Sequence, residues 1–421
     1  MSRRQFLLVL IGITLIAFAL RVGVASHFQG LDAKPDAESN PDQLDYELFA
    51  WRVADGQGYT LPTGVATARR PPGTSFALVP VYALCGHSYS AARLFFCAVS
   101  AATCLVAGLV AAELGGLLTG LLAAAALAFL PSHFYYAQHF LSEVPYGLAI
   151  SVACWCALRG FRSETTAAPA PRGTLWLDLA TGLAFGFAIL TRPQTAFAGP
   201  IALLGALLSR REVRGRRLLR IVVVGLASAA VVAPWVVRNQ RELGKATLST
   251  VGGFTFWGAN NAVIAAGPDA GSWMPVDTLI DAAHPLDGSE IENDASAWRY
   301  GFEFIRSHSA DVPRLLAQKF VRHFSPFRDT SNRAVYWTFA LGWIVLAPLL
   351  VAGCVILWRR AQAGGLLVLA PIASTLITVV IFYGSVRFRD AEAALQVVPA
   401  AAAFELLLPR RWRTQREPLA A

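Results

Sequence analysis

The sequence predicts an all-α polytopic membrane protein of about ten transmembrane helices, with loops and one small segment outside the membrane. Hydrophobic residues make up 55% of the 421 residues and charged residues only 15%, whereas soluble globular chains carry about 25% charged residues. The apolar residues gather in long runs that basic clusters separate. The net charge of +9 is therefore attributed to the membrane rather than to nucleic acid, and the six cysteines, in or beside apolar runs, do not indicate a disulfide framework.

The first apolar run extends from Phe6 to about Ala25 and follows Arg3-Arg4. It is long enough to cross a bilayer. Its end, Val24-Ala-Ser26, also resembles a signal-peptide cleavage site, but the run is longer than a typical signal core. We therefore expect an uncleaved anchor, with a cleaved signal peptide as the alternative.

Nine further apolar runs are predicted to span the membrane. They are 89–112, 116–133, 143–160, 175–191, 193–209, 218–237, 334–358, 363–383 and 391–408. The two runs on either side of Arg192-Pro193 are each barely long enough, so one kinked element is an alternative there. The stretch 73–86 is shorter still and is expected to be re-entrant or interfacial.

The distribution of basic residues predicts the orientation. The short loop 210–220 holds six arginines and one glutamate, which is typical of a cytoplasmic loop. The first loop (28–72) and the long segment 238–333 then face the periplasm or the exterior of an inner or plasma membrane. Three parts follow: an N-terminal transmembrane module (1–237) with a catalytic first loop, an extracytoplasmic cap segment (238–333), and a C-terminal transmembrane module with a basic cytoplasmic tail (334–421). Two amphipathic helices are expected in the cap segment, at 295–308 and 311–324.

Acidic residues gather at the predicted outer ends of the spans. Asp42, Asp45 and Glu47 lie in the first loop, and on a helix Asp42, Asp45 and Tyr46 share one face. Glu143 opens a span, where a carboxylate is costly unless it faces water or a partner. A solvated loop surface would also explain the first group, whereas a general base would need such a carboxylate within reach of a substrate.

Arginines collect at the same ends of the spans. The candidates for substrate binding are Tyr46, Arg69, Arg70, Arg192, Arg238, Asn239, Arg387 and Arg389. A guanidinium offers a planar fork of donors that suits phosphate, although each arginine alone would also fit an interfacial anchor. Acids and arginines together indicate an anionic, phosphate-bearing substrate and a carboxylate base. The seven histidines form no metal set, so no cofactor is expected; a divalent metal is compatible with the residues but not indicated.

These stretches, in this order, resemble the C-type (GT-C) superfamily of membrane glycosyltransferases. The likeness is greatest to the branch of protein O-mannosyltransferases and of the aminoarabinose transferases that modify lipid A. The matching stretches are Asp42…Tyr46…Ala50…Gly56-Gln-Gly58-Tyr59, Arg70-Pro-Pro-Gly73, Leu141-Ser-Glu143, Leu190-Thr-Arg192-Pro193, Pro234-Trp…Arg238-Asn239, Gly252-Gly253…Gly258-Ala-Asn260-Asn261 and Arg387-Phe-Arg389.

The resemblance implies transfer of a hexosyl or pentosyl group from a polyprenyl-phosphate carrier to an acceptor hydroxyl on the outer face, with inversion. The acceptor would be a lipid, a glycan or a protein. The resemblance also implies that Asp42 acts as the base or positions the acceptor, that Glu143 is a second acidic position, and that Arg70 lies near the donor phosphate. The family often has two adjacent acids, whereas this chain has Gln43, so the roles of Asp42 and Asp45 stay open.

Two other function classes compete with this interpretation. A transporter or flippase of an anionic lipid would also use arginines near the membrane, but it would more often show charges at mid-membrane depth and repeated halves. The sequence contains no internal repeat. A non-catalytic assembly subunit would tolerate Asp42→Asn, which an enzyme would not.

Overall fold

The computed structural model describes residues 1–37, 40–165, 173–208, 211–328, 330, 332–360 and 362–409. Over these residues every regular element is a helix, and the only strand-like pairing is one antiparallel bridge between Thr60 and Ala66. The predicted all-α class is confirmed. The basic tail that was predicted to be cytoplasmic lies beyond residue 409, outside the described residues.

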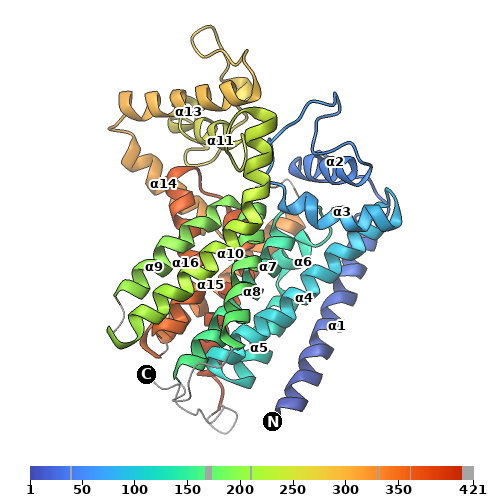
Figure 1. Cartoon of the computed structure of the whole chain (residues 1–421), viewed down its shortest axis with the longest axis vertical. Helices are drawn as coiled ribbons and strands as arrows, with labels where there is room; N and C mark the ends of the chain where they lie inside the picture. The colour runs from blue at the N-terminus through green and yellow to red at the C-terminus, as the bar shows by residue number, and fades with distance from the viewer. Residues whose placement is uncertain are drawn as a thin grey trace.

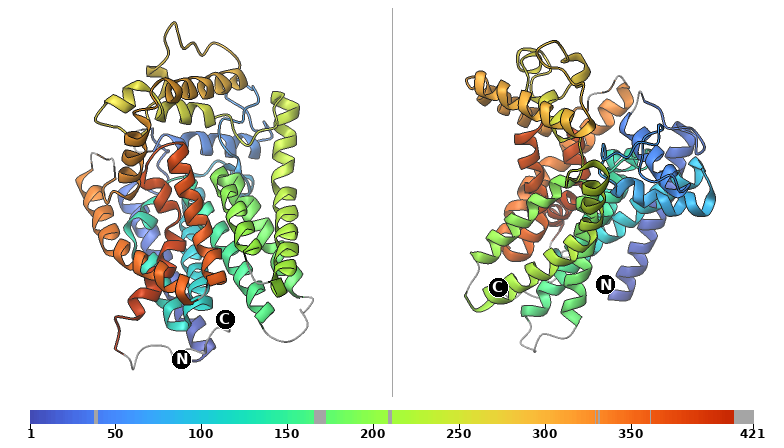
Figure 2. Two further views of the ribbon diagram at one scale, coloured as in Figure 1. Left: turned by 90° about the vertical axis from the view of Figure 1, so that its left-hand side faces the viewer. Right: turned by 45° about the horizontal axis from the view of Figure 1, so that its top comes forward.

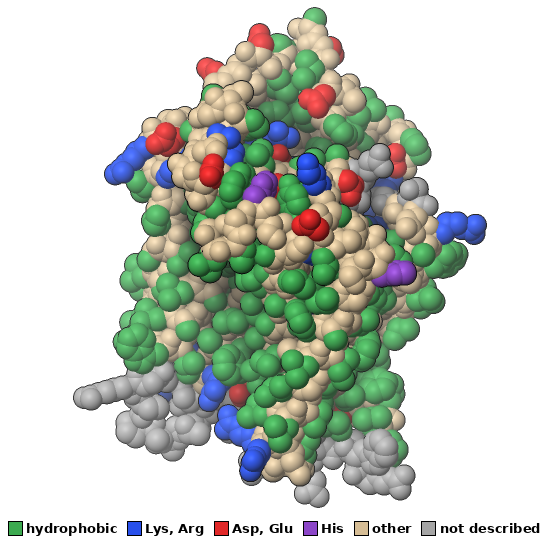
Figure 3. Space-filling view, turned by 90° about the vertical axis from the view of Figure 1, so that its right-hand side faces the viewer, with side chains coloured by type: hydrophobic (Ala, Val, Ile, Leu, Met, Phe, Trp, Pro, Cys, Tyr) green, Lys and Arg blue, Asp and Glu red, His purple; other side chains and the backbone are tan. Residues whose placement is uncertain are grey.

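In the described part of the chain, six helices are long and apolar enough to cross a membrane. They are α1 (Arg3–Phe28), α4 (Tyr89–Gly115), α7 (Glu143–Thr165), α10 (Arg211–Leu243), α15 (Arg333–Arg360) and α16 (Gln362–Ile381). Figure 3 shows a broad apolar band on one face, with charged side chains confined to its two ends. The chain is thus a multi-pass membrane protein, and the predicted number of ten spans is not confirmed.

Shorter helices occupy the other four predicted spans. They are α5 (Leu117–Phe129) with α6 (Pro131–Tyr136), α8 (Gly173–Thr191), the 3-10 helix η1 (Pro193–Phe197) with α9 (Ala198–Leu207), and α18 (Ala393–Glu405). Arg192 has an extended backbone, as residues before proline prefer, and the chain reverses direction there (Figure 1). Residues 175–191 and 193–209 therefore form separate elements rather than one kinked helix.

The cap segment lies over one end of the helix bundle (Figures 1 and 2). It contains α11 (Gly252–Ala259), α12 (Ala262–Ala266), η2 (Val276–Thr278), α13 (Glu290–Ser307) and α14 (Val312–Phe324). Both predicted cap helices exist, but α13 begins five residues earlier than expected, because Ser289 and Glu292 form a capping box.

Two helices of the first loop region lie at this same end of the bundle. They are α2 (Asp42–Ala54) and α3 (Gly73–Cys85), which pack against each other. The N-terminus lies at the opposite end, together with the start of α10 (Figure 1). The predicted first outer loop and the Arg-rich loop region thus flank opposite ends of the bundle.

Small residues allow the helices of the bundle to approach closely. A Cβ atom on Gly108 of α4 would lie 3.0 Å from the carbonyl oxygen of Gly120 in α5, and one on Gly353 of α15 would lie 1.9 Å from that of Pro399 in α18. Almost all of α18 is buried. Membrane helices have little hydrophobic force between them, so such close contacts supply much of the packing. This rigid frame carries the loops at the cap end.

Arg21 is a fully buried cation inside the first span. Its guanidinium donates to the hydroxyl of Ser100 at 2.7 Å and to the carbonyl oxygens of Leu127 and Ala128, in the last turn of α5. It therefore satisfies carbonyls that a helix end leaves without partners. The charge ties α1 to the end of α5.

Arg21→Met is expected to lower the melting temperature in detergent, because it removes several buried hydrogen bonds from a charged donor, each of which contributes about 1.5–3 kcal/mol. Thermal unfolding of the purified protein measures the change. Leu15→Met is the matched control on the same helix, since Leu15 is 63% exposed in the structure. Equal melting temperatures for Arg21→Met and the control would contradict this account of Arg21.

Candidate active site

Helix α2 presents two of the predicted acids at its start. Asp42 and Asp45 lie in its first turn, where the helix dipole favours negative charge. Tyr46 is buried on the same side, and its carbonyl oxygen accepts a hydrogen bond from Ser75 of α3 at 2.9 Å. The contact between the two helices fixes where the carboxylates stand.

Arg70 joins the two aspartates. Its Nη2 lies 2.8 Å from Oδ1 of Asp42, and its Nε lies 2.8 Å from Oδ2 of Asp45. Arg69 contacts the same Asp45 oxygen at 3.5 Å, with 57% of its side chain exposed. Arg70 is thus the inner cation of the pair and Arg69 the outer one.

Arg387 joins Asp42 to the third predicted acid. It is the second residue of the short helix α17 (Val386–Ala391). Its Nη1 lies 2.9 Å from Oδ2 of Asp42, and its Nε lies 2.9 Å from Oε1 of Glu143. Arg192 contacts that Glu143 oxygen at 3.5 Å and donates to the hydroxyl of Ser142 at 2.9 Å.

The six groups form one alternating series of charges. In order they are Asp45, Arg70, Asp42, Arg387, Glu143 and Arg192. They come from α2, the loop before α3, the start of α7, the junction of α8 with η1, and α17. The structure therefore brings together the three predicted catalytic acids and three of the predicted substrate-binding arginines, and Arg69 is a fourth at the edge. Tyr46 lies under Arg70, whose guanidinium carbon is 6.0 Å from the ring centre.

The arginines control the ionisation of Asp42. Burial raises the pKa of this carboxyl, but Arg387 and Arg70 outweigh it and hold the pKa at about 2. Burial likewise opposes the charge on Arg387, and Glu143 and Asp42 raise its pKa well above the usual value. Asp42 is thus ionised at neutral pH, and each of its oxygens already has an arginine partner.

A cavity of about 220 Å³ adjoins Arg387. It lies between the cap segment, the end of α14 and the turn after α16. Its lining residues are Ser272, Trp273, Arg322, Ser325, Phe327, Arg328, Tyr383, Gly384, Ser385, Val386 and Arg387. They include three arginines and no carboxylate; Arg322 and Arg387 pair with acids outside the lining, so an anion in the cavity would compete with those acids for them. Its volume is below the roughly 300–1,000 Å³ of drug-sized pockets, which suits a headgroup rather than a whole lipid-linked sugar.

Arg328 and Arg322 line this cavity, and the sequence analysis did not select them. Arg328 donates to the Tyr136 hydroxyl at 2.6 Å and to Oδ1 of Asn40 at 3.0 Å, and it stacks on Tyr135. Arg322 lies 3.0 Å from Asp269. The only sequence signal was a pair of arginines at and after the end of an amphipathic helix, which a solvated helix surface also explains.

Arg238 and Asn239 lie outside the charge series. Arg238 donates to the carbonyl oxygens of Thr67 and Tyr59 at 2.7 and 2.6 Å. Asn239 donates to the carbonyl oxygen of Thr247 at 2.8 Å. Both fix the backbone of the loops that flank the site.

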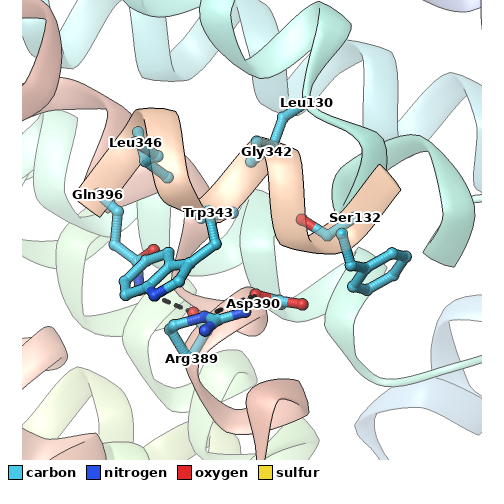
Figure 4. A pocket seen from close by; sticks show the side chains of 10 residues that line it. Leu130, Ser132, Gly342, Trp343, Leu346, Arg389, Asp390 and Gln396 are labelled. Atoms are coloured by element: carbon cyan, nitrogen blue, oxygen red, sulfur yellow. Dashed lines mark hydrogen bonds and ion pairs between the residues drawn. The ribbon is translucent and has the colours of Figure 1, made fainter. Parts of the chain in front are cut away.

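Arg389 takes no part in the charge series and lies beside Trp343 and Asp390 (Figure 4). It stacks on Trp343 at 3.9 Å, pairs with Asp390 at 2.9 Å and donates to the carbonyl oxygen of Ser325 at 2.6 Å. The cavity beside it measures only about 10 Å³, about the minimum for a single water molecule. Arg389 therefore anchors α17 to α15.

Among the described residues, no group of three or more His, Cys, Asp or Glu side chains is arranged to hold a metal ion. The expectation that the chain uses no cofactor stays a prediction.

Part of the sequence matches the model of a known protein family. Residues 69–237 match the family model described as dolichyl-phosphate-mannose-protein mannosyltransferase. No curated protein matches the chain significantly in sequence.

The solved structures that resemble the chain include the oligosaccharyltransferase AglB from Archaeoglobus fulgidus, in complex with an inhibitory peptide and a dolichol-phosphate. That match has a TM-score of 0.60 at 14% identity and covers 96% of this chain and 50% of that one. The apo form of an Archaeoglobus fulgidus oligosaccharyltransferase gives 0.56 at 13%, covering 96% and 51%. ArnT from Cupriavidus metallidurans, bound to undecaprenyl phosphate, gives 0.44 at 15%, covering 95% and 78%. The chain thus spans about half the length of the archaeal enzymes, and the likeness to them is one of fold.

Proposed function

We propose that the chain is a membrane glycosyltransferase of the GT-C superfamily and that it transfers a sugar from a polyprenyl-phosphate carrier to an acceptor hydroxyl, with inversion. The acceptor is a lipid, a glycan or a protein. The observation that carries the proposal is the position of Asp42 between two arginines. One of them, Arg387, lines a cavity that has three arginines and no acid in its lining.

The reaction is a single displacement at the anomeric carbon. The bond from that carbon to the phosphate oxygen breaks, the bond to the acceptor oxygen forms, and the acceptor proton passes to a carboxylate. Phosphate is already a good leaving group, and Arg387 and Arg328 at the cavity offset the charge that develops on it. The arginines supply this positive charge themselves, so the proposed mechanism requires no metal.

The ion pairs of Asp42 suggest how donor binding prepares the base. A phosphate in the cavity competes with Asp42 and Glu143 for Arg387, which contacts both. When Arg387 turns toward phosphate, the pKa of Asp42 rises from its low value, because an opposing charge has moved away. Asp42 then accepts a proton more readily, so the base is activated after the donor has bound.

The pH profile should reflect this activation. The pKa of Asp42 is below its usual 3.8, so its ion pairs are complete at neutral pH and are lost only as the pH falls toward 2. We expect kcat/KM for the donor, which reports the free enzyme, to show no acid limb between about pH 5 and 8. The acid limb of kcat should lie at a higher pH than that of kcat/KM, because the pKa of Asp42 rises once the donor has bound. Initial rates across this range measure both, and an acid limb of kcat/KM near neutral pH would contradict the assignment of Asp42.

The proposed active site faces the periplasm or the exterior. The site and the cap segment lie at one end of the bundle, and the Arg-rich start of α10 lies at the other (Figure 1). Arginines favour the cytoplasmic side of short loops, which supports this orientation.

The direct test is sugar transfer by the purified, detergent-solubilised protein. Radiolabelled polyprenyl-phosphate sugars and a membrane-lipid extract are supplied to the wild type and to Asp42→Asn. Label that reaches a new lipid or protein band with the wild type alone supports the proposal. If the wild type consumes no donor but scrambles lipid in vesicles, the chain is a flippase and the proposal fails.

A further inference from the structure

Lys319 of α14 is a buried cation in the cap segment, with 1% of its surface exposed. Its ammonium donates to Oδ1 of Asn260 at 2.8 Å and to the carbonyl oxygens of Val380 and Ile381 at 3.3 and 3.5 Å. In the described part of the chain no carboxylate pairs with it. Helix α16 ends at Ile381, so Lys319 satisfies carbonyls that have no partner within the helix.

The same face of α14 also holds the turn that follows α16. His323, one helical turn after Lys319, contacts the carbonyl oxygen of Ser385 through Nδ1 at 3.2 Å. The backbone of Gly384 lies against Lys319, since a Cβ atom on Gly384 would be 1.9 Å from the Lys319 carbonyl oxygen. Helix α14 thus fixes the chain at Ile381 and again at Ser385, and only residues 382–384 lie between these two points.

This short connection leads directly to the central arginine of the site. The hydroxyl of Ser385 accepts a hydrogen bond from the backbone N–H of Arg387 at 3.2 Å. Arg387 contacts Asp42 and Glu143 and lines the anion cavity. A shift of α16's end is therefore transmitted to these contacts through five residues of chain.

Burying a lysine without a carboxylate costs stability. Burial alone lowers the pKa of Lys319 to about 8, which shows how unfavourable the charge is at this place. A methionine would fill similar space without that penalty. The ammonium, however, reaches three acceptors on two separate segments, which no apolar side chain does.

We propose that Lys319 is a positioning residue for sugar transfer: by fixing the end of α16 to the cap segment, it sets the position of Arg387. The proposal rests on the function proposed above. This role differs from that of a simple helix cap. Loss of a simple cap would lower stability without changing how the site binds its donor.

The test compares Lys319→Met with Gln318→Met, a neighbour on the exposed side of α14. Hydrogen–deuterium exchange of the peptide 382–388 reports the connection itself. We expect exchange to be about tenfold faster in Lys319→Met and unchanged in the control. Asn260→Ala removes one acceptor of Lys319 and is the second variant, should Lys319→Met not fold.

Kinetics then show whether Lys319 acts through Arg387. With a radiolabelled undecaprenyl-phosphate sugar, Lys319→Met should raise the donor KM about fivefold and leave the acceptor KM unchanged within about twofold. In an Arg387→Lys background, Lys319→Met should change the donor KM by less than about twofold, because residues that act in one chain of contacts are not additive.

Each outcome decides the question. Unchanged exchange of 382–388 overturns the proposal, and so does a fall in kcat alone with the donor KM unchanged. An undiminished effect of Lys319→Met in the Arg387→Lys background shows that Lys319 acts elsewhere. If the wild type transfers no sugar, the proposed function fails, and the exchange result alone decides whether Lys319 holds the connection to Arg387.

Discussion

Asp42→Asn is expected to lower the rate of sugar transfer by about 10²–10⁴-fold, the usual contribution of a general base, while the protein stays in the membrane at wild-type levels. The amide has the size of the carboxylate, but its single carbonyl oxygen can accept from only one of Arg70 and Arg387, which contact the two carboxylate oxygens at 2.8 and 2.9 Å. The amide also cannot take a proton from the acceptor. Arg70 keeps its contact with Asp45 and Arg387 keeps its contact with Glu143, so neither arginine is left without a carboxylate and the protein should still fold.

Initial rates with saturating donor measure this effect. Asp55→Asn is the matched control, because Asp55 directly follows the last residue of the same helix and is exposed. If Asp42→Asn kept more than about a tenth of the wild-type rate, the base would be Asp45 or another group, and Asp45→Asn would be the next variant.

Arg387→Met is expected to destabilise the protein by about 3–5 kcal/mol, the usual cost of breaking a buried ion pair from one side. Glu143 has a side chain that is only 2% exposed, and it would keep one cationic partner, Arg192 at 3.5 Å, and the hydroxyl of Ser142 at 3.4 Å. Asp42 would lose one of its two partners. The double variant Arg387→Met/Glu143→Gln removes the uncompensated charge and should recover at least half of the loss.

Thermal unfolding in detergent distinguishes these variants. The wild-type protein, expressed in the same membranes, is the reference. Transfer should be lost in both variants, since Arg387 also lines the anion cavity. A single variant as stable as the wild type would mean that water screens the Glu143 pair. The charge series would then contribute to catalysis alone.

Local patterns made part of the site predictable. Asp42, Asp45 and Tyr46 share a helix face by spacing alone, and α2 does begin at Asp42. Arg192, Arg387 and Glu143 each stand at or beside a predicted span end, and Arg70 lies at the end of the predicted first outer loop. Alternation of direction places all of these positions on one side of the membrane. Sequence reasoning could therefore predict that these groups share one side, but not that Arg387 would touch both Asp42 and Glu143.

The remaining parts depended on contacts that the sequence does not display. Arg238 stands at a span end just as Arg387 does, yet its partners are backbone carbonyls, which every residue possesses. Lys319 lies on the same buried face of α14 as Leu315 and His323, and the sequence does not display the end of α16 that supplies two of its acceptors. The number of spans was difficult for a similar reason, because helices such as α18 are buried by neighbours and need not be long.

The pairing of Asp42 with Arg387 joins residues 345 positions apart in the chain, and that of Glu143 with Arg387 joins residues 244 apart. During synthesis both carboxylates therefore leave the ribosome long before their shared partner does. The nascent chain must carry them in the membrane without that arginine until α16 has been inserted and α17 follows. A chain that stops before residue 387 leaves Asp42 with Arg70 alone and Glu143 with Arg192 alone, so the two halves of the charge series are joined only when synthesis is almost complete.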